Sequence, residues 1–407
     1  MNIEVHTRTH CRVCGSERLR EFLNLPNTPL VADYLRKEKL GTEFIWPLRI
    51  FLCLECGLTQ TAHDIDERNY YDDYQYAPSL SPFTQRFMKR LAEGLWQKYE
   101  LKRGDNVVEI GSSDGSQLSY FQELGARVLG FEFSTPLAHE ARRKGIETLQ
   151  TEFGDQSETI PADRLPVQLV ITTHTFDHMP DPGGFLRAVK KVLDPQRGLL
   201  VIEVHDLDEI IARREFCLFA HEHPGYYSEQ TMQMVLRRAG FEMINVDLIP
   251  KPERRGNSLV AVATPQGSRW AADALSQPPL DPQKLEQSYR SFGDSIQTSL
   301  NGLRRFVKSK RDAGLKLAGY GTGGRGVMTL AAIAEPGDFA YVCDKNPGFH
   351  GRYTPGSHIP IYPADQLLAD PVDEVIVFSF GYFQEIFDEL KDFRAGGGRL
   401  ISLLDLL

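Results

Sequence analysis

Four cysteines near the start of the chain form two identical pairs, Cys11 with Cys14 and Cys53 with Cys56. Each C-x-x-C spacing places two thiolates on one tight turn, and two such turns supply the sulfur ligands of a tetrahedral zinc site. A closed sulfur shell leaves no position for a reacting molecule, so we expect a structural zinc ion. His10, beside Cys11, could replace one of these ligands, but we expect it to be solvated. The long segment between the two pairs predicts an inserted strand or hairpin.

A glycine-bearing turn supplies a second chemical signal. The apolar run NVVEI leads into Glu109-Ile-Gly111-Ser-Ser-Asp114-Gly115, and glycines at the carboxyl end of a parallel strand let the backbone approach a ligand. Glu132 ends the next apolar run, where a carboxylate can accept both ribose hydroxyls of an adenosine. The turn has too few glycines for a dinucleotide fingerprint. The whole pattern resembles the motif of class I methyltransferases, which bind S-adenosylmethionine.

Histidines follow the third apolar run, in the segment LVITTHTFDHMPDP. His174, Asp177 and His178 stand where class I methyltransferases place residues that flank the cofactor. By that resemblance we expect His174 and His178 to bind it.

A triplet of ionisable residues, His221-Glu222-His223, lies beside aromatic residues. An imidazole is partly unprotonated near neutral pH, so it can take up a proton. Without further context, such a triplet is more often a surface loop or a satisfied core cluster.

A second glycine motif follows the run LKLAGY near residue 320. Gly319, Gly321 and Gly324 match G-x-G-x-x-G between a predicted strand and a predicted helix, and Asp344 ends the next strand. This spacing leaves a nicotinamide-dependent dehydrogenase open as an alternative.

The elements that must position these residues alternate between strand and helix. A helical spacing runs from Ser79 to Lys102, and a longer one from Gln283 to Asp312. The strands expected in the middle of the chain are Asn106–Ile110, Ala126–Phe131, Val167–Thr172 and Gly198–Val204. This alternation predicts an α/β protein with a parallel doubly wound sheet. We expect three domains: a zinc-binding module at 1–75, a cofactor-binding core at 76–265 and a smaller α/β domain at 283–407.

Composition limits the classes of protein. The chain has 407 residues, 41% hydrophobic and 25% charged, as in soluble globular proteins. It has no apolar run of the ~20 residues that a membrane span requires, and its start lacks a secretory signal. The net charge of −9 argues against a nucleic-acid-binding protein. Cys217 and Cys343, the remaining cysteines, lie far apart, so we expect a cytoplasmic protein without membrane contact.

Taken in order, these motifs resemble the carbon-methyltransferases that act on nucleotide-activated ketosugars in branched-deoxysugar and antibiotic biosynthesis. The resemblance spans nearly the whole chain. It includes PLVADYL, Tyr76 in YAPSLS, the segment EVHDLDEIIARREFCLFAHEHPGYYS, and in the third domain GYGTGGRG and VCDKNPGFHGRYTPGSHIPI. It implies a class I methyltransferase core, S-adenosylmethionine as cofactor, a structural zinc ion and a C-terminal Rossmann-like domain, in a monomer or weak homo-oligomer.

The resemblance also implies roles for single residues. His223 is the expected base, Glu222 orients it or holds a sugar hydroxyl, His221 completes the cluster, and Tyr76 is a partner of the enolate or of a hydroxyl. A base that removes the proton beside a ketone, with a donor at the enolate oxygen, makes the carbon nucleophilic. In the third domain the resemblance places the sugar nucleotide on Gly321, Gly324, Arg325, Lys345 and Arg352.

This chain also departs from the family. Ala220 replaces a tyrosine, Arg255-Gly256-Asn257-Ser258-Leu259-Val260 replaces a His-Gly-Gly-Ser-Leu-Arg segment, and FGYFQEI replaces a Trp-Asn segment. The first change removes a phenol expected near the sugar; Tyr226 or Tyr227 are possible substitutes. Two further hypotheses therefore stay open: enolisation without methyl transfer, as in epimerisation, isomerisation or ring rearrangement, and a sensing or scaffolding protein that binds a sugar nucleotide.

Overall fold

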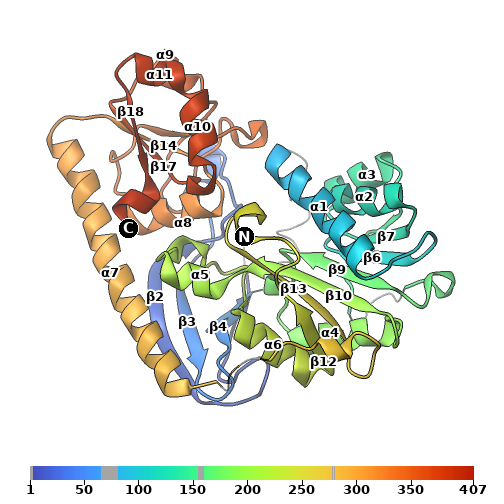
Figure 1. The fold of residues 1–407 in the computed structure, drawn as a ribbon. Coiled ribbons are helices and arrows are strands. Elements are labelled where there is room, and N and C mark those ends of the chain that lie inside the picture. The colour runs from blue at the N-terminus through green and yellow to red at the C-terminus, as the bar shows by residue number, and fades with distance from the viewer. Residues whose placement is uncertain (1–2, 66–80, 155–159, 277, 279) are drawn as a thin grey trace.

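The computed structural model describes residues 3–65, 81–154, 160–276, 278 and 280–407, which form three packed parts (Figure 1). Tyr76 lies outside the described residues. Among the helices that are described, none is both long and apolar enough to cross a bilayer.

The N-terminal part is a small antiparallel sheet beside the two cysteine pairs. Its elements are β1 (Val5–Thr7), β2 (Leu19–Pro29), η1 (Lys37–Lys39), β3 (Ile45–Cys53), β4 (Thr59–Thr61) and β5 (His63–Ile65). β2 and β3 form the predicted hairpin between the cysteine pairs, and β1 pairs with β5 in a separate ribbon. Alternate residues of β3, Leu48, Ile50 and Leu52, are buried, which is the period of a strand with one face on a core.

One strand of this sheet comes from the middle of the chain. β11 (Gly225–Tyr226), just after the His221–His223 triplet, pairs antiparallel with β4. The Thr61 N–H also donates to the Pro224 carbonyl. The predicted zinc-binding module and the predicted core thus share a sheet. A strand of two residues has no recognisable sequence pattern, so this pairing could not be predicted.

The middle part is a seven-stranded sheet in the order β12-β13-β10-β9-β6-β7-β8. Its strands are β6 (Asn106–Ile110), β7 (Arg127–Phe131), β8 (Thr148–Leu149), β9 (Leu169–Thr173), β10 (Leu199–His205), β12 (Phe241–Asn245) and β13 (Ser258–Pro265). Its helices are α1 (Pro82–Lys98), α2 (Ser116–Leu124), α3 (Thr135–Arg143), α4 (Pro182–Val192), α5 (Leu207–Ala212) and α6 (Glu229–Arg238). The expected strands are present, but the sheet is not wholly parallel, because β13 runs antiparallel to β10 and β12.

The C-terminal part has a parallel five-stranded sheet in the order β16-β15-β14-β17-β18. Its strands are β14 (Leu317–Tyr320), β15 (Tyr341–Cys343), β16 (Ile361–Tyr362), β17 (Glu374–Val377) and β18 (Arg399–Ser402). Its helices are α8 (Gly324–Ile333), α9 (Gln366–Ala369), α10 (Phe383–Glu389) and α11 (Lys391–Ala395). The glycine motif forms the β14-to-α8 turn, as predicted.

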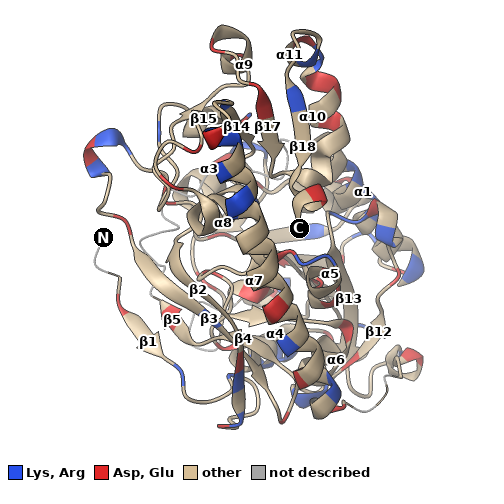
Figure 2. Ribbon diagram, turned by 90° about the vertical axis from the view of Figure 1, so that its left-hand side faces the viewer, with Lys and Arg blue, Asp and Glu red and all other residues tan. Residues whose placement is uncertain are grey.

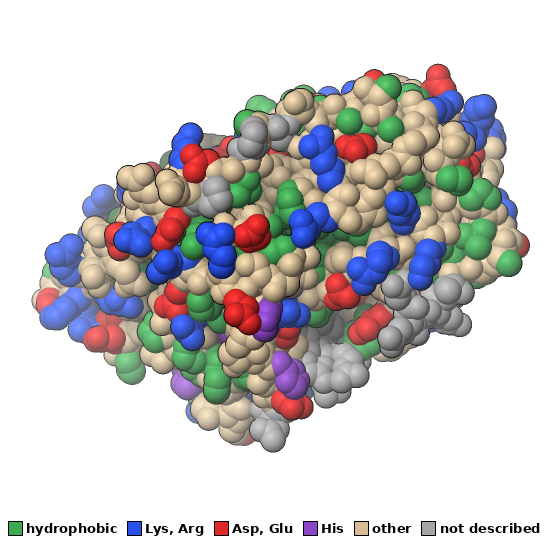
Figure 3. Space-filling model, turned by 90° about the horizontal axis from the view of Figure 1, so that it is seen from below, with side chains coloured by type: hydrophobic (Ala, Val, Ile, Leu, Met, Phe, Trp, Pro, Cys, Tyr) green, Lys and Arg blue, Asp and Glu red, His purple; other side chains and the backbone are tan. Residues whose placement is uncertain are grey.

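The long helix α7 (Pro282–Asp312) lies along one side of the molecule, from the hairpin β2–β3 to the C-terminal sheet (Figure 1). Its buried face joins one hydrophobic core with residues of all three parts, among them Leu25, Phe219 and Met328. Basic and acidic residues are interspersed along the exposed side of α7 (Figure 2) and over the face seen in Figure 3.

Candidate active site

The two cysteine pairs come together as a four-sulfur cluster. All four Sγ atoms lie within 4.8 Å of one another, with 3.5 Å between Cys11 and Cys56 and 3.6 Å between Cys14 and Cys53. Zn–S bonds of about 2.3 Å put tetrahedral sulfurs roughly 3.7 Å apart, so the cluster fits a zinc ion. Gly15 and Gly57, the next residues after each pair, have φ of 73° and 74° and close the two turns alike.

His10 is solvated, as expected. Its ring contacts Thr9 and Glu17 at the surface, and its side chain is 52% exposed. It is therefore not needed to complete the cluster.

The turn from β6 to α2 approaches the loop after β9 closely. Gly111 has φ of 72°, and a Cβ atom there would overlap the side chain of Thr175. Asp114 is buried and forms an ion pair of 2.6 Å with Lys144, and Gly115 caps α2 with φ of 75°. The glycines therefore let this turn pack closely on its neighbours at the carboxyl edge of the sheet, where doubly wound folds bind cofactors.

Two buried glutamates flank this turn in sequence, Glu109 on β6 before it and Glu132 after β7. Glu132 accepts 2.7 Å hydrogen bonds from the Ser113 and Ser134 N–H groups, and burial raises its pKa. Burial also raises the pKa of Glu109 well above its ordinary value. A carboxylate has about four lone-pair positions, so Glu132 retains acceptor capacity for a ribose.

Four histidines, His174, His178, His205 and His223, lie close together next to the β6-to-α2 turn. The ring centroids of His174 and His205 are 4.7 Å apart, those of His178 and His223 are 4.5 Å apart, and those of His205 and His223 are 6.0 Å apart. Burial, with the nearby His223, lowers the pKa of His178 to about 3, and burial also lowers the pKa of His205 well below its ordinary value. Both are thus uncharged near neutral pH.

The residues of the His221–Glu222–His223 triplet differ in whether their side chains can reach a substrate. His221 is 1% exposed; its Nε2 donates to the Thr28 carbonyl over 3.0 Å, and its Nδ1 lies 2.8 Å from Nε2 of His63. Both ring nitrogens are therefore engaged by the N-terminal part. This geometry suits a positioning role better than the catalytic role expected from sequence.

His223 keeps one ring nitrogen available for chemistry. Its Nδ1 donates to the Leu218 carbonyl over 3.3 Å, which leaves the lone pair on Nε2. Glu222 accepts a 2.6 Å hydrogen bond from the Val31 N–H.

The segment around Val31 also reaches the C-terminal part. The Tyr34 hydroxyl donates to the Thr322 carbonyl over 2.6 Å, and Tyr34 stacks on Phe349. The triplet is therefore held against all three parts of the molecule.

The two tyrosines considered as substitutes for the family phenol point elsewhere. The Tyr226 hydroxyl accepts from the Ala220 N–H over 2.9 Å and donates to the Ala220 carbonyl. Tyr227 is 0% exposed, and its ring packs on Phe176. Neither hydroxyl is available to a substrate in this arrangement.

The residues expected to bind the sugar nucleotide are only partly gathered. Arg325, near the start of α8, stacks over Phe380 and lies against Gly256 of the middle part. Lys345 instead pairs with Glu385 and Glu389.

Two further residues of the third domain lie near this site. Arg352 donates weakly to the Tyr34 carbonyl. Asp344, the acid considered for a dehydrogenase, accepts from the N–H and the hydroxyl of Thr322.

His205 and the buried ion pair of Glu203 with Arg255 were not predicted from the sequence. His205 and Glu203 lie on β10, and Arg255 comes from the loop before β13. The available signal was the position of a histidine at the end of a predicted core strand.

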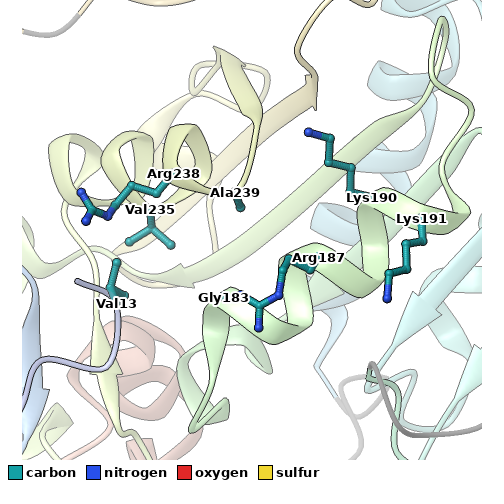
Figure 4. Close-up of a pocket in the computed structure, with 8 residues that line it drawn as sticks. All are labelled: Val13, Gly183, Arg187, Lys190, Lys191, Val235, Arg238 and Ala239. Carbon is teal, nitrogen blue, oxygen red and sulfur yellow. The ribbon is translucent and has the colours of Figure 1, made fainter. Parts of the chain in front are cut away.

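A separate hollow lies between α4 and α6 (Figure 4). Its lining residues are Val13, Gly183, Arg187, Lys190, Lys191, Val235, Arg238 and Ala239. None of them is among the residues predicted to form the site.

Three family models match successive parts of the chain. A zinc binding domain matches residues 11–71, a methyltransferase domain matches residues 80–246, and a C-methyltransferase C-terminal domain matches residues 281–404. Together they leave few residues unmatched.

The chain is also similar to individual proteins, over very different shares of its length. The chain is 29% identical to C-methyltransferase NovU of Streptomyces niveus over 403 residues, covering 96% of this chain and 94% of NovU. Over 87 residues it is 30% identical to protein-L-isoaspartate O-methyltransferase 1 of Nitrosospira multiformis, covering 20% of this chain and 36% of that protein. Magnesium protoporphyrin IX methyltransferase of Synechocystis PCC 6803, solved with bound S-adenosylmethionine, matches with a TM-score of 0.35 and 16% identity, covering 49% and 89% of the two chains.

Proposed function

We propose that this protein methylates a ring carbon beside the ketone of a nucleotide-linked 4-keto-deoxysugar. The proposal starts from the family, because the chain belongs to the S-adenosylmethionine-dependent C-methyltransferases that carry a zinc-binding domain. The observation that carries this proposal is His223, which has a free Nε2 lone pair next to the loop that packs on the cofactor turn. S-adenosylmethionine, when bound, supplies an electrophilic methyl group.

We assign the cofactor to the turn from Glu109 to Gly115. Gly111 and Gly115 supply the positive φ that the turn requires, Asp114 is fixed by Lys144, and Glu132 accepts the ribose hydroxyls. His174 and His178, in the loop that packs on Gly111, flank the bound cofactor.

The base is His223. Its Nε2 takes the proton from the carbon beside the ketone, while Nδ1–H stays on the Leu218 carbonyl and fixes the ring. The carbon becomes nucleophilic as the electron pair moves toward the ketone oxygen. Glu222 holds the Val31 segment, and His221 holds the triplet on the zinc-binding part.

The nucleotide lies on the C-terminal part. The turn at Gly321 leads into α8, whose N-terminal N–H groups from Gly324 onward favour a diphosphate. Arg325, placed at the junction with the middle part, adds a charge-assisted contact. Arg352 and Lys345 serve the outer phosphate or sugar, and Lys345 must first leave its ion pairs on α10.

A panel of ketosugar nucleotides incubated with S-adenosylmethionine tests this function by mass spectrometry. A product that gains one methyl group is the expected result, and no gain with any member of the panel contradicts the proposal. His223→Asn should lower methyl transfer by roughly 100- to 10,000-fold, the usual contribution of a general base. His139→Gln, at an exposed position on α3, is the matched control.

A second function, enolisation that ends in epimerisation or another isomerisation, is favoured by Ala220. The side chain there carries no donor, and the nearby Tyr226 hydroxyl is taken by the Ala220 backbone. A product of unchanged mass whose ring proton exchanges with deuterium from heavy water would assign this function. Loss of the exchange in His223→Asn is expected in both cases.

A further inference from the structure

A second group of metal-ligating side chains lies beside the cofactor turn. His174, Asp177 and His205 each offer one ligand atom, and these atoms all lie within 4.8 Å of one another. His174 and Asp177 follow β9, whereas His205 ends β10, its parallel neighbour. Adjacent strands therefore deliver two imidazoles and one carboxylate to the same edge of the sheet, a set that binds divalent transition metals with open positions.

Two of these residues keep an unpaired buried atom. Within the described residues, Oδ1 of Asp177 and Nδ1 of His205 have no hydrogen-bond partner. Asp177 is only 3% exposed, so solvent does not compensate its carboxylate. Buried polar atoms are rarely left unpaired in native proteins, and a bound cation would satisfy both of these.

The backbone at His174 is strained in a way that places its ring in this group. His174 has φ of 49°, a left-handed conformation that non-glycine residues seldom adopt. Its N–H donates to the Glu203 carbonyl over 2.8 Å, which fixes the strained turn. Such strain concentrates at functional sites.

Charges around the group set limits on the ion. Arg325 acts electrostatically on His205 and opposes a cation. Glu203 lies 3.5 Å from the His174 ring and is paired with Arg255, so Asp177 is the ligand that must offset the cation's charge. Two nitrogen ligands and one oxygen suit zinc or cobalt better than magnesium or calcium, which prefer oxygen alone.

We propose that His174, Asp177 and His205 bind a divalent transition-metal ion at a site separate from the four cysteines. Metal–ligand bonds of about 2.0–2.2 Å require the three ligand atoms to close to roughly 3–3.5 Å. That closure is a matter of small side-chain rotations, since His174 and His205 already lie ring to ring. His223 lies beside this site, with its ring centroid 6.0 Å from that of His205.

The ion has a role in the reaction. This role rests on the proposed function, whereas the existence of the metal site does not. As the His223 base removes the proton, negative charge develops on the ketone oxygen. A Lewis acid beside the base stabilises that charge. It would replace the donor that is missing at Ala220.

Metal content of the full-length protein tests the site. After equilibrium dialysis against zinc, elemental analysis should find two ions per chain in the wild type and in His139→Gln. Asp177→Asn and His205→Gln should each hold one, and the retained ion together with an unchanged melting temperature shows that the fold is intact. One ion in the wild type, or two in both variants, would overturn the site.

Cobalt distinguishes the two sites by their ligands. Cobalt added to protein that keeps zinc on its cysteines should give d–d absorption without thiolate charge-transfer bands. Those bands, or no absorption at all, would contradict a nitrogen and oxygen site.

The task of the ion is tested by proton exchange. Removal of the second ion with a weak chelator should slow deuterium wash-in to a bound ketosugar on the order of 100-fold, as for loss of one oxyanion donor. Added zinc should restore the rate. An equal rate of deuterium wash-in with and without the second ion would show that the ion does not act in the reaction. No wash-in under any condition would count against the proposed function, but the metal content would still test the binding site.

Discussion

Glu132 shows how one buried residue can organise a cofactor site before the cofactor binds. Its oxygens accept from the N–H groups of Ser113 and Ser134, so it ties the cofactor turn to the start of α3. The same burial raises its pKa, which makes the ionised form more costly than at the surface. Donors from a ribose would favour the ionised form and offset that cost.

Glu132→Gln should therefore weaken binding of S-adenosylhomocysteine by about 1.5–3 kcal/mol at pH 8, the range for hydrogen bonds to a charged group. Because burial raises the pKa of Glu132, protonation begins at a higher pH than for an exposed glutamate. Wild-type affinity should fall as the pH drops through this pKa, and the advantage over Glu132→Gln should shrink. Calorimetry of both proteins between pH 8 and pH 5 measures the difference.

The exposed residue Glu123, on α2, provides the matched control. Glu123→Gln should bind like the wild type at each pH. A constant ratio between wild type and Glu132→Gln over the whole range would mean that Glu132 does not titrate in the free protein.

Elements differ in how far their sequence determines them. The strand β6, its glycine turn and α2 were predictable because their signals are local: an apolar run, residues that tolerate positive φ and a helical period. β11 was not, since two residues carry no period and its partner β4 lies far away in the chain. The same holds for His205, whose importance depends on which strand lies next to β10.

α7 illustrates a local signal with a tertiary constraint. Its helical period was clear from the sequence, but Gly293 in its interior is unfavourable for a helix. The structure gives the reason: a Cβ atom at Gly293 would overlap the carbonyl oxygen of Phe22 on β2. The glycine lets the helix and the strand approach, and Phe22 packs on Tyr289 and Phe292.

Gly293→Ala should lower the free energy of unfolding by about 1–3 kcal/mol, because the overpacked contact outweighs the gain in helix propensity. Gly302, on the same helix, has no atom within 4 Å of its would-be Cβ. Gly302→Ala should instead raise it by about 0.5–1 kcal/mol. Chemical denaturation of the two variants measures both changes in the free energy of unfolding. Equal changes would mean that the close contact between Gly293 and the Phe22 carbonyl does not matter for stability.

At the scale of the whole molecule, the zinc-binding part is connected to the His221–His223 triplet by three routes. β11 joins β4 just after His223, His63 contacts His221, and Arg12 of the first cysteine turn donates to the Pro180 carbonyl over 3.0 Å. Pro180 stands next to the loop that carries His178. The zinc ion can therefore govern the position of His223, the proposed base, without touching the substrate.

Cys14→Ser should separate cofactor binding from turnover. Loss of zinc would loosen the sheet that holds β11 and the turn that holds Arg12, and a displacement of about 1 Å at a reacting group costs on the order of 100-fold in rate. Deuterium wash-in should fall by roughly that factor. Affinity for S-adenosylhomocysteine should stay within about threefold, less than 1 kcal/mol, because Glu132 and the cofactor turn belong to the separate seven-stranded sheet.

His10→Gln, beside the cysteine turn but solvated, should retain zinc and turnover. Equal losses of binding and turnover in Cys14→Ser would instead mean that the whole chain unfolds without zinc, and unchanged turnover in zinc-free protein would disconnect the two parts.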